Sequence, residues 1–272
     1  MSDRSAPRTV SPALLGMEGD WLPVTAGESG AFVFRSADAT RYAKCVPAAD
    51  VADLAAERDR IAWLSGQGVP GPRVLDWYAG DAGSCLVTRA VSGVSADQVR
   101  AEDLRASWGH IADAVRRLHE VPVSSCPFHR GLDDVVAVAR DVVARDAVNP
   151  EFLPLEQQHV PPAELLTRLG GEIPRRRDQA VADTVVCHGD LCLPNIILDP
   201  GTSRVSGFID LGRLGAADRH ADLALLLAQA RETWVDEGRA RAADMAFAER
   251  YGIALDHDRL RFYLHLDPLT WG

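Results

Sequence analysis

Three polar side chains in the second half of the chain have the types and the spacing needed to act on a hydroxyl group and a magnesium ion. Asp190 follows the apolar segment 184–187, and Asn195 comes five residues after Asp190. A carboxylate placed there can accept a hydrogen bond from an attacking hydroxyl, and an amide oxygen on the same loop can reach a metal ion. Asp210 follows a second apolar segment, 205–209, and offers the hard oxygen ligand that magnesium prefers. We therefore predict that Asp190 orients or deprotonates an acceptor hydroxyl and that Asn195 and Asp210 bind magnesium.

The order of these residues is typical of enzymes that transfer a phosphoryl group. In protein kinases the catalytic loop reads H-R-D-x-x-x-x-N and the metal-binding segment reads D-F-G. Here the spacing from the aspartate to the asparagine is the same, while Gly189 replaces the arginine and Leu211 replaces the phenylalanine. Alone, Asp210 would be interpreted as a turn residue, but the loop upstream favours a metal ligand. No A-P-E segment follows, which disfavours a protein kinase.

A second group of candidates lies in the first ninety residues and would hold the phosphates of ATP. The turn 26–30, Ala-Gly-Glu-Ser-Gly, could cover them, because glycine lets the backbone approach a phosphate closely. It lacks the full G-x-G-x-x-G pattern, so a plain hairpin turn is an equal alternative. Lys44 lies on the next expected strand, and Glu57 on the following helix could hold its ammonium near the α- and β-phosphates. For both charges a solvent-facing position is the alternative, and Arg58 and Arg60 lie close to Glu57 in sequence.

The elements expected around these residues divide the chain into a β-rich first part and a helical second part. In the first part, short apolar segments predict strands and one periodic segment predicts a helix: strands 31–34, 41–46, 73–78 and 84–90, and helix 50–64. In the second part, amphipathic spacing predicts helices that flank the two strands already named: 103–119, 135–148, 163–169, 221–234, 239–251 and 258–266. The order predicts an α+β, protein-kinase-like fold of two lobes. We expect a partly flexible extension over 1–20, an N-lobe with an antiparallel β-sheet and one helix over 21–92, and a mostly helical, catalytic and acceptor-binding C-lobe over 93–272.

Composition excludes several other classes of protein. The chain has 272 residues and a formal net charge of −10. The sequence shows no basic face of the kind that would indicate a nucleic-acid partner. The one basic run, 175–177, is flanked by acidic residues and is interpreted as a solvated helix face. The longest apolar run, 223–228, is too short to cross a membrane. The five cysteines are odd in number, form no C-x-x-C pair and match no zinc pattern, so we expect reduced thiols in a cytoplasmic protein. We also expect a monomer.

Taken together, the motifs resemble those of the aminoglycoside phosphotransferases, and the resemblance runs over residues 21–272. The segments that carry it are 188–195, 209–213, 217–219 and 222–224. Within the family, three further segments are most similar to the members that phosphorylate the 3″-hydroxyl of streptomycin: 21–24, 149–154 and 266–272. The resemblance implies transfer of the γ-phosphoryl group from ATP to that antibiotic, with magnesium as cofactor.

The resemblance also implies roles for residues that bind the two substrates. By position, Ser29 and Gly30 would cover the phosphates, Tyr42 would stack on adenine, and Ala90 would hydrogen-bond the adenine ring. Lys44 would hold the phosphates.

At the acceptor site, Asp267 and the terminal carboxylate of Gly272 would contact the antibiotic, because carboxylates form strong, directional pairs with guanidinium groups. For Asp267 an Asp-Pro turn is the alternative. Arg213 and Asp222 would brace the loops rather than touch the substrate.

Two other functions fit the same motifs. A kinase of this fold could act on choline, homoserine or another aminoglycoside, since the ATP motifs do not distinguish the acceptor. A non-catalytic, nucleotide-binding pseudokinase would lack a catalytic or metal-binding residue, and this reading is disfavoured because Lys44, Asp190, Asn195 and Asp210 are all in place.

Overall fold

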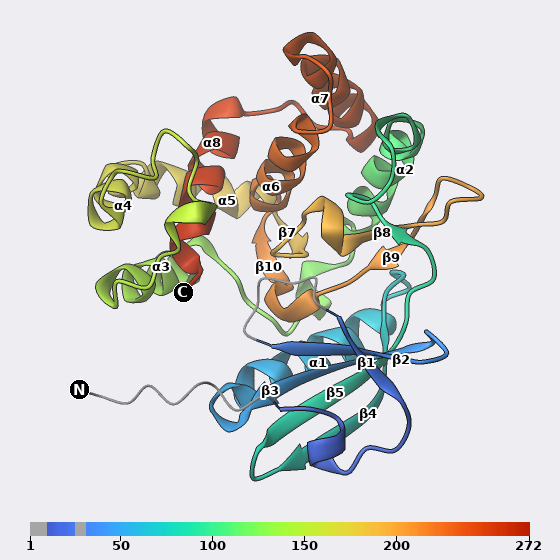
Figure 1. Ribbon diagram of the computed structural model, residues 1–272. Helices are drawn as coiled ribbons and strands as arrows, with labels where there is room; N and C mark the ends of the chain where they lie inside the picture. Colours follow the sequence, from blue (N-terminus) through green and yellow to red (C-terminus); the bar gives the residue numbers. More distant parts are fainter. Residues whose placement is uncertain (1–9, 25–30) are drawn as a thin grey trace. The chain divides into compact units, whose positions relative to one another are not determined.

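The computed structural model describes residues 10–24 and 31–272, which form two compact units (Figure 1). The first, the N-lobe unit, contains the chain up to Ser92 together with Ser206–Gly212. The second, the C-lobe unit, contains Gly93–Val205 and Arg213–Gly272. The segment that carries Asp210 therefore belongs to the N-lobe unit although it lies deep in the second half of the sequence.

The N-lobe unit is built on a five-stranded antiparallel sheet with the order β1-β2-β3-β5-β4. Its strands are β1 Trp21–Val24, β2 Phe32–Ser36, β3 Arg41–Pro47, β4 Arg73–Gly80 and β5 Gly83–Arg89. The helix α1, Val51–Ser65, packs on β3, β4 and β5 (Figure 1). It buries Leu54, Glu57, Ile61 and Leu64, which recur at helical spacing.

Alternation along β3 decides which side chains face α1. Ala43 and Cys45 are fully buried on one face, in a cluster that also contains Val10 and Met17 from the start of the described chain. Because successive side chains of a strand point to opposite faces, Lys44 points to the other side, where it meets Glu57 of α1. The sheet thus places one partly buried cation on the face that the helix covers.

The structure corrects the expectation that all five cysteines are reduced. Cys45 and Cys85 lie directly opposite each other in the register of β3 and β5 and form a disulfide. Their sequence separation of 40 hides this pairing, because only the register of the two strands brings the sulfurs together. Cys187, by contrast, keeps a buried thiol.

The C-lobe unit is mostly helical. Its helices are α2 Ala101–His119, α3 Leu132–Ala144, α4 Pro162–Gly170, α5 Ile173–Asp183, α6 Arg219–Arg231, α7 Glu237–Tyr251 and α8 His257–Leu266. The helix α2 packs on α7, and α6 packs on α8 (Figure 1). The apolar faces of α3, α4, α6 and α8 share one core, and α6 also packs on β7 and β10.

Short strands that follow β5 along the chain include those that flank the polar motifs. They are β6 Val94–Ser95, β7 Thr184–Cys187, β8 Ile196–Leu198, β9 Val205–Phe208 and β10 Gly215–Asp218. The strand β7 pairs antiparallel with β10, and β6 pairs with β8. The loop between β7 and β8 carries the H-G-D segment, and β9 leads into Asp210.

The kinase-like α+β fold predicted from the sequence is confirmed, with differences in detail. The bounds of α5 were not predicted, because only Ile173 and Arg176 of it are buried and no apolar stripe marks it. The run 175–177 was expected on a solvated helix face, and the structure corrects this for Arg176, which is fully buried and bonds Glu172 at 2.6 Å. The strands β1, β6, β8 and β10 were also not predicted, since segments of two to four residues show no hydrophobic periodicity. The predicted helix 135–148 begins and ends earlier, at Leu132 and Ala144.

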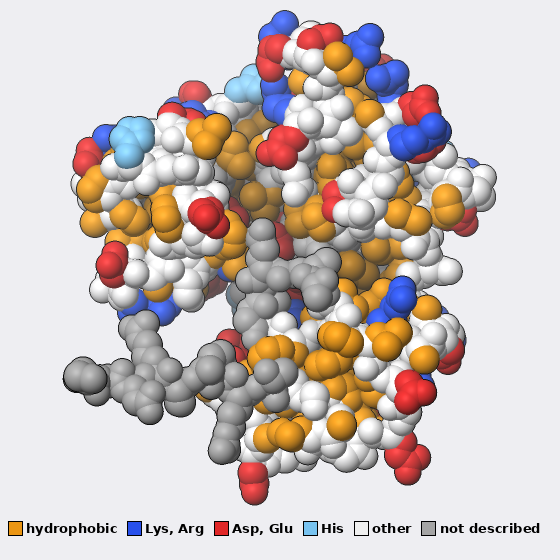
Figure 2. Space-filling model, viewed as in Figure 1, with side chains coloured by type: hydrophobic (Ala, Val, Ile, Leu, Met, Phe, Trp, Pro, Cys, Tyr) orange, Lys and Arg blue, Asp and Glu red, His pale blue; other side chains and the backbone are white. Residues whose placement is uncertain are grey.

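The surface of the C-lobe unit carries paired rather than segregated charges along α7. Figure 2 shows acidic and basic side chains interspersed there. Glu237 contacts both Arg231 and Arg241, and Arg239 contacts Asp236. Within residues 10–24 and 31–272, no helix combines the length and the apolar character required to cross a membrane.

Candidate active site

The catalytic loop brings Asp190 and Asn195 together, as their spacing predicted. The Asn195 amide Nδ2 donates to the backbone oxygen of Asp190 at 2.9 Å and to its carboxylate Oδ2 at 3.1 Å. The loop closes through a further hydrogen bond, in which the backbone N–H of Asn195 donates to the Cys192 carbonyl at 3.1 Å. Because the amide nitrogen orients the carboxylate, the amide oxygen of Asn195 is the atom that can serve a metal ion.

Gly189 explains why this loop reads H-G-D. Its φ is +86°, and a Cβ at this position would lie 2.1 Å from the carbonyl oxygen of Arg213. Any side chain would therefore meet backbone that cannot move aside as a flexible side chain can. Only glycine lets the catalytic loop pass this close to the segment that follows Asp210.

Replacing Gly189 with alanine is expected to destabilise the protein and to disable it. Backbone strain at a positive φ costs about 1–3 kcal/mol, and the contact with the Arg213 carbonyl adds to it. Thermal unfolding of Gly189→Ala should show a clear fall in Tm, while Gly109→Ala, where a Cβ meets nothing within 4 Å, should not. Equal Tm values for the two variants would contradict the close approach.

Asp222 of α6 holds the catalytic loop through two of its backbone amides. Its carboxylate accepts from the backbone amide of His188 at 2.7 Å and from that of Gly189 at 2.8 Å, and its side chain is fully buried. Burial raises the pKa of Asp222, but hydrogen bonds from His119 and the Gly189 amide, with the charges of nearby histidines, outweigh it and hold the pKa below its ordinary value. Asp222 is thus an ionised acceptor for two consecutive amides, which matches the bracing role expected from the sequence.

A second set of candidate residues lies in the N-lobe unit, where one cation bridges two carboxylates. The Lys44 ammonium lies 2.8 Å from Glu57 Oε2 and 3.0 Å from Asp210 Oδ1. Burial lowers the pKa of Lys44, but the two carboxylates together raise it well above its usual range. Lys44 is therefore permanently charged, and Glu57, which is almost fully buried, holds it in place. Asp210 adopts a positive φ of 57°, an uncommon conformation for a residue other than glycine.

Of the other candidates for nucleotide binding, Tyr42 and Ala90 lie within the described residues. Tyr42 lies on β3 two residues before Lys44, so both side chains share one face of the sheet. The backbone N–H of Ala90 donates to the Thr40 carbonyl at 2.8 Å, which leaves the Ala90 carbonyl as the group that could serve an adenine amino group. Ser29 and Gly30 lie outside the described residues.

The acceptor candidate Asp267 belongs to a network that fixes the end of the chain. Its Oδ2 accepts from the Trp271 indole at 3.0 Å, and its Oδ1 lies 3.5 Å from Arg213 and 3.9 Å from Arg130. The Arg213 guanidinium also stacks on the Trp271 ring at 3.4 Å and donates to the Thr270 hydroxyl at 2.9 Å. Arg213 thus braces the terminal segment, as the sequence indicated.

Gly272 ends this segment in a tight position. A Cβ there would lie 2.5 Å from the Ala147 carbonyl and 2.7 Å from a methyl group of Val142. The close packing against the end of α3 fixes where the last residue lies. The contacts of Asp267 and Gly272 with an antibiotic stay predictions.

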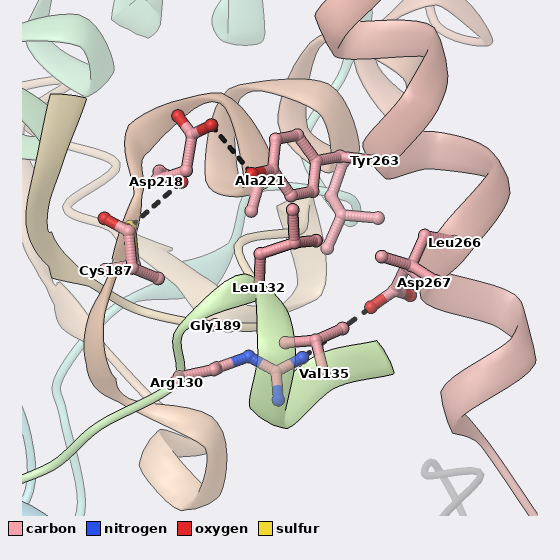
Figure 3. Close-up of a pocket in the computed structure, with 12 residues that line it drawn as sticks. Arg130, Leu132, Val135, Cys187, Gly189, Asp218, Ala221, Tyr263, Leu266 and Asp267 are labelled. Atoms are coloured by element: carbon pink, nitrogen blue, oxygen red, sulfur yellow. Dashed lines mark hydrogen bonds and ion pairs between the residues drawn. The ribbon is translucent and has the colours of Figure 1, made fainter. Parts of the chain in front are cut away.

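A small cavity of the C-lobe unit lies beside this network (Figure 3). Arg130 and Asp267 lie at one end of it, while Asp218 and Tyr263, joined by a hydrogen bond of 2.7 Å, lie elsewhere along its wall. Its volume of about 30 Å³ suits a water molecule rather than a substrate. The cavity is therefore not an acceptor site by itself.

These two sets of residues define a phosphotransferase that acts on a small molecule: a charged lysine held by glutamate and aspartate, and an aspartate held by asparagine on a braced loop. A family model described as the phosphotransferase enzyme family (APH) matches residues 20–263. The chain belongs to this family.

Individual relatives show which kinds of enzyme within the family the chain is similar to. The chain is 80% identical over 272 residues to the streptomycin 3″-kinase of Streptomyces griseus, and the match covers both chains completely. It is 44% identical over 262 residues to an aminoglycoside 3′-phosphotransferase of Streptomyces fradiae, covering 91% of this chain and 94% of that one. The solved structure of aminoglycoside phosphotransferase APH(3″)-Id from Streptomyces rimosus, in complex with ADP and streptomycin, matches with a TM-score of 0.89 and 65% identity over 93% of each chain. These similarities confirm the family resemblance found in the motifs.

Proposed function

We propose that the protein transfers the γ-phosphoryl group of ATP to the 3″-hydroxyl of streptomycin and so inactivates the antibiotic. The observation that carries the proposal is the 80% identity, over the full length of both chains, to the streptomycin 3″-kinase of Streptomyces griseus. The complex of the Streptomyces rimosus enzyme with ADP and streptomycin, at 65% identity, supports an adenine nucleotide as the donor product.

On the donor side, the N-lobe unit would bind ATP through the ammonium of Lys44. Lys44, held by Glu57 at 2.8 Å, would contact the α- and β-phosphates. Tyr42 would stack on adenine, and the Ala90 carbonyl would accept from its amino group. Ser29 and Gly30 would cover the phosphates.

On the acceptor side, Asp190 would accept the hydrogen bond of the attacking hydroxyl and aim its oxygen at the γ-phosphorus. Asn195 holds the Asp190 carboxylate, and Asp222 holds the loop. The donor atoms of Asn195 and Asp210 are oxygens of the hard type that suits magnesium. When bound by them, the ion would neutralise charge on the phosphates.

Recognition of the antibiotic would rest on carboxylates near the chain end. Asp267 Oδ1 is 3.5 Å from Arg213 and 3.9 Å from Arg130. These contacts are longer than a good charge-assisted hydrogen bond, so a substrate guanidinium can form a shorter one with the same oxygen. The Gly272 carboxylate would add a second negative charge.

The test is magnesium-dependent ADP release by the purified protein with streptomycin, kanamycin, choline or homoserine as acceptor. We expect release with streptomycin alone, a product heavier by one phosphate, and a phosphorus-to-proton NMR correlation that places the phosphate on the 3″ carbon. Turnover of another acceptor would remove the substrate assignment but keep the roles of Asp190, Asn195 and Asp210. ATP binding without any turnover would instead support a pseudokinase.

We also propose that the protein acts as a monomer in the cytoplasm. Light scattering during size-exclusion chromatography should give the mass of one chain, 29.4 kDa. A mass twice as large would contradict the first part, and activity confined to an extracytoplasmic fraction of the producing cell would contradict the second.

A further inference from the structure

A chain of buried hydrogen bonds within the C-lobe unit ends at the catalytic loop. It begins at Tyr251, the last residue of α7, whose hydroxyl lies 2.7 Å from His119 Nδ1. His119 is the last residue of α2, and its Nε2 lies 3.1 Å from Asp222 Oδ2. Asp222 in turn accepts the backbone amides of His188 and Gly189. No step of the proposed reaction uses His119 or Tyr251.

The contacts define which ring nitrogen of His119 carries the proton. The Asp222 carboxylate can only accept a hydrogen bond, whereas the Tyr251 hydroxyl, 2.7 Å from Nδ1, can either donate to that nitrogen or accept from it. Nε2 then carries the hydrogen and donates to the Asp222 carboxylate. The His119 side chain is only 2% exposed, and its ring meets that of Tyr251 edge-on at 5.7 Å between centroids, so the ring has little freedom to turn.

A metal site is the other interpretation of this cluster, because ligand atoms of His119, Cys187 and Asp222 lie within 4.8 Å of one another. Hydrogen bonds already account for all three. The Cys187 thiol donates to the carbonyls of Ala217 and Asp218 at 3.6 and 3.5 Å, and burial raises its pKa well above the ordinary value. A neutral thiol is a poor metal ligand, so the cluster is a hydrogen-bond network.

We propose that His119 is a positioning residue for phosphoryl transfer: it donates to Asp222, keeps both carboxylate oxygens turned to the catalytic-loop amides, and thereby fixes Asp190. Tyr251 contacts the other ring nitrogen and holds the imidazole in place. The inference rests on the proposed function for its kinetic test, but its structural test does not. A misplacement of about 1 Å at a reacting group can cost on the order of 100-fold in rate, so a residue that acts only through Asp222 can control kcat.

The kinetic test compares His119→Leu with His119→Gln. Leucine removes the donor, whereas the glutamine amide can still donate to Asp222. We expect kcat to fall between about tenfold and 100-fold in His119→Leu, with the KM values for ATP and streptomycin unchanged, and most of the rate to return in His119→Gln. Leu118→Ala, a fully buried truncation one residue earlier on α2, is the control: it should lower Tm but leave kcat near that of the parent protein.

The structural test measures hydrogen exchange at the backbone amides of His188 and Gly189 in the same four proteins. We expect faster exchange in His119→Leu, protection in His119→Gln, and protection in Leu118→Ala. If the protein turns over a different acceptor, or none, the proposed function fails while these amides still report on His119. A His119→Leu variant with parental kcat and parental exchange would overturn the proposal, as would equal losses in the leucine and glutamine variants.

Discussion

Replacing Asp190 with alanine is expected to lower kcat by about 10²–10⁴-fold, the usual contribution of a general base. The carboxylate is the group that would take the hydrogen bond of the attacking hydroxyl, and Asn195 Nδ2 holds it at 3.1 Å. The loop should keep its shape, because Asn195 also bonds the backbone oxygen of residue 190 and Asp222 holds the two preceding amides. Steady-state ADP release at saturating substrates measures the change.

The matched control is Asp141→Ala, which removes the same charge from an exposed side chain on α3. It should leave kcat unaltered. ATP affinity, measured by calorimetry, should be similar in both variants. Near-parental turnover of Asp190→Ala would show that the hydroxyl loses its proton without this carboxylate.

Replacing Asp210 with asparagine is expected to lower activity by at least about 100-fold at ordinary magnesium concentrations, since preorganised charge at a phosphoryl group is worth that much. The substitution removes one negative ligand and also one of the two carboxylates beside Lys44. Titration of activity with magnesium at fixed ATP separates the two effects. The midpoint should move to higher magnesium concentrations in Asp210→Asn.

The comparison is Glu57→Gln, which removes the other carboxylate beside Lys44 but no proposed metal ligand. It should raise the KM for ATP and leave the magnesium midpoint in place. If Glu57→Gln moved the midpoint as far as Asp210→Asn does, the role of Asp210 would be that of a lysine partner alone.

The parts of the site that could be predicted from the sequence are those where short segments carry the geometry. Asp190 and Asn195 share one loop, so their spacing alone brings them together. Lys44 and Glu57 are separated by one turn and part of a helix, and alternation on β3 places the lysine toward α1. In each case the distance along the chain is small enough for local periodicity to fix the partners.

Other contacts depended on register and packing that no local pattern shows. His119 and Asp222 are 103 residues apart. They meet only because the fold brings the end of α2 next to α6. The Cys45–Cys85 disulfide depends on the register of β3 and β5. Asp267 was expected to face a substrate, and its additional bond to Trp271 follows from a short helical turn at the chain end.

The backbone approach at Gly189 also limits how this catalytic loop can change. A single base change converts a glycine codon to an arginine codon, so the H-R-D sequence of protein kinases is genetically one step away. The Arg213 carbonyl lies 2.1 Å from where a Cβ of residue 189 would lie. It therefore excludes arginine at position 189 as long as the backbone keeps its present conformation. An evolving sequence could exchange H-G-D for H-R-D only after the segment following Asp210 had moved. The two changes must therefore occur in that order, and the required order limits the exchange more than the number of base changes does.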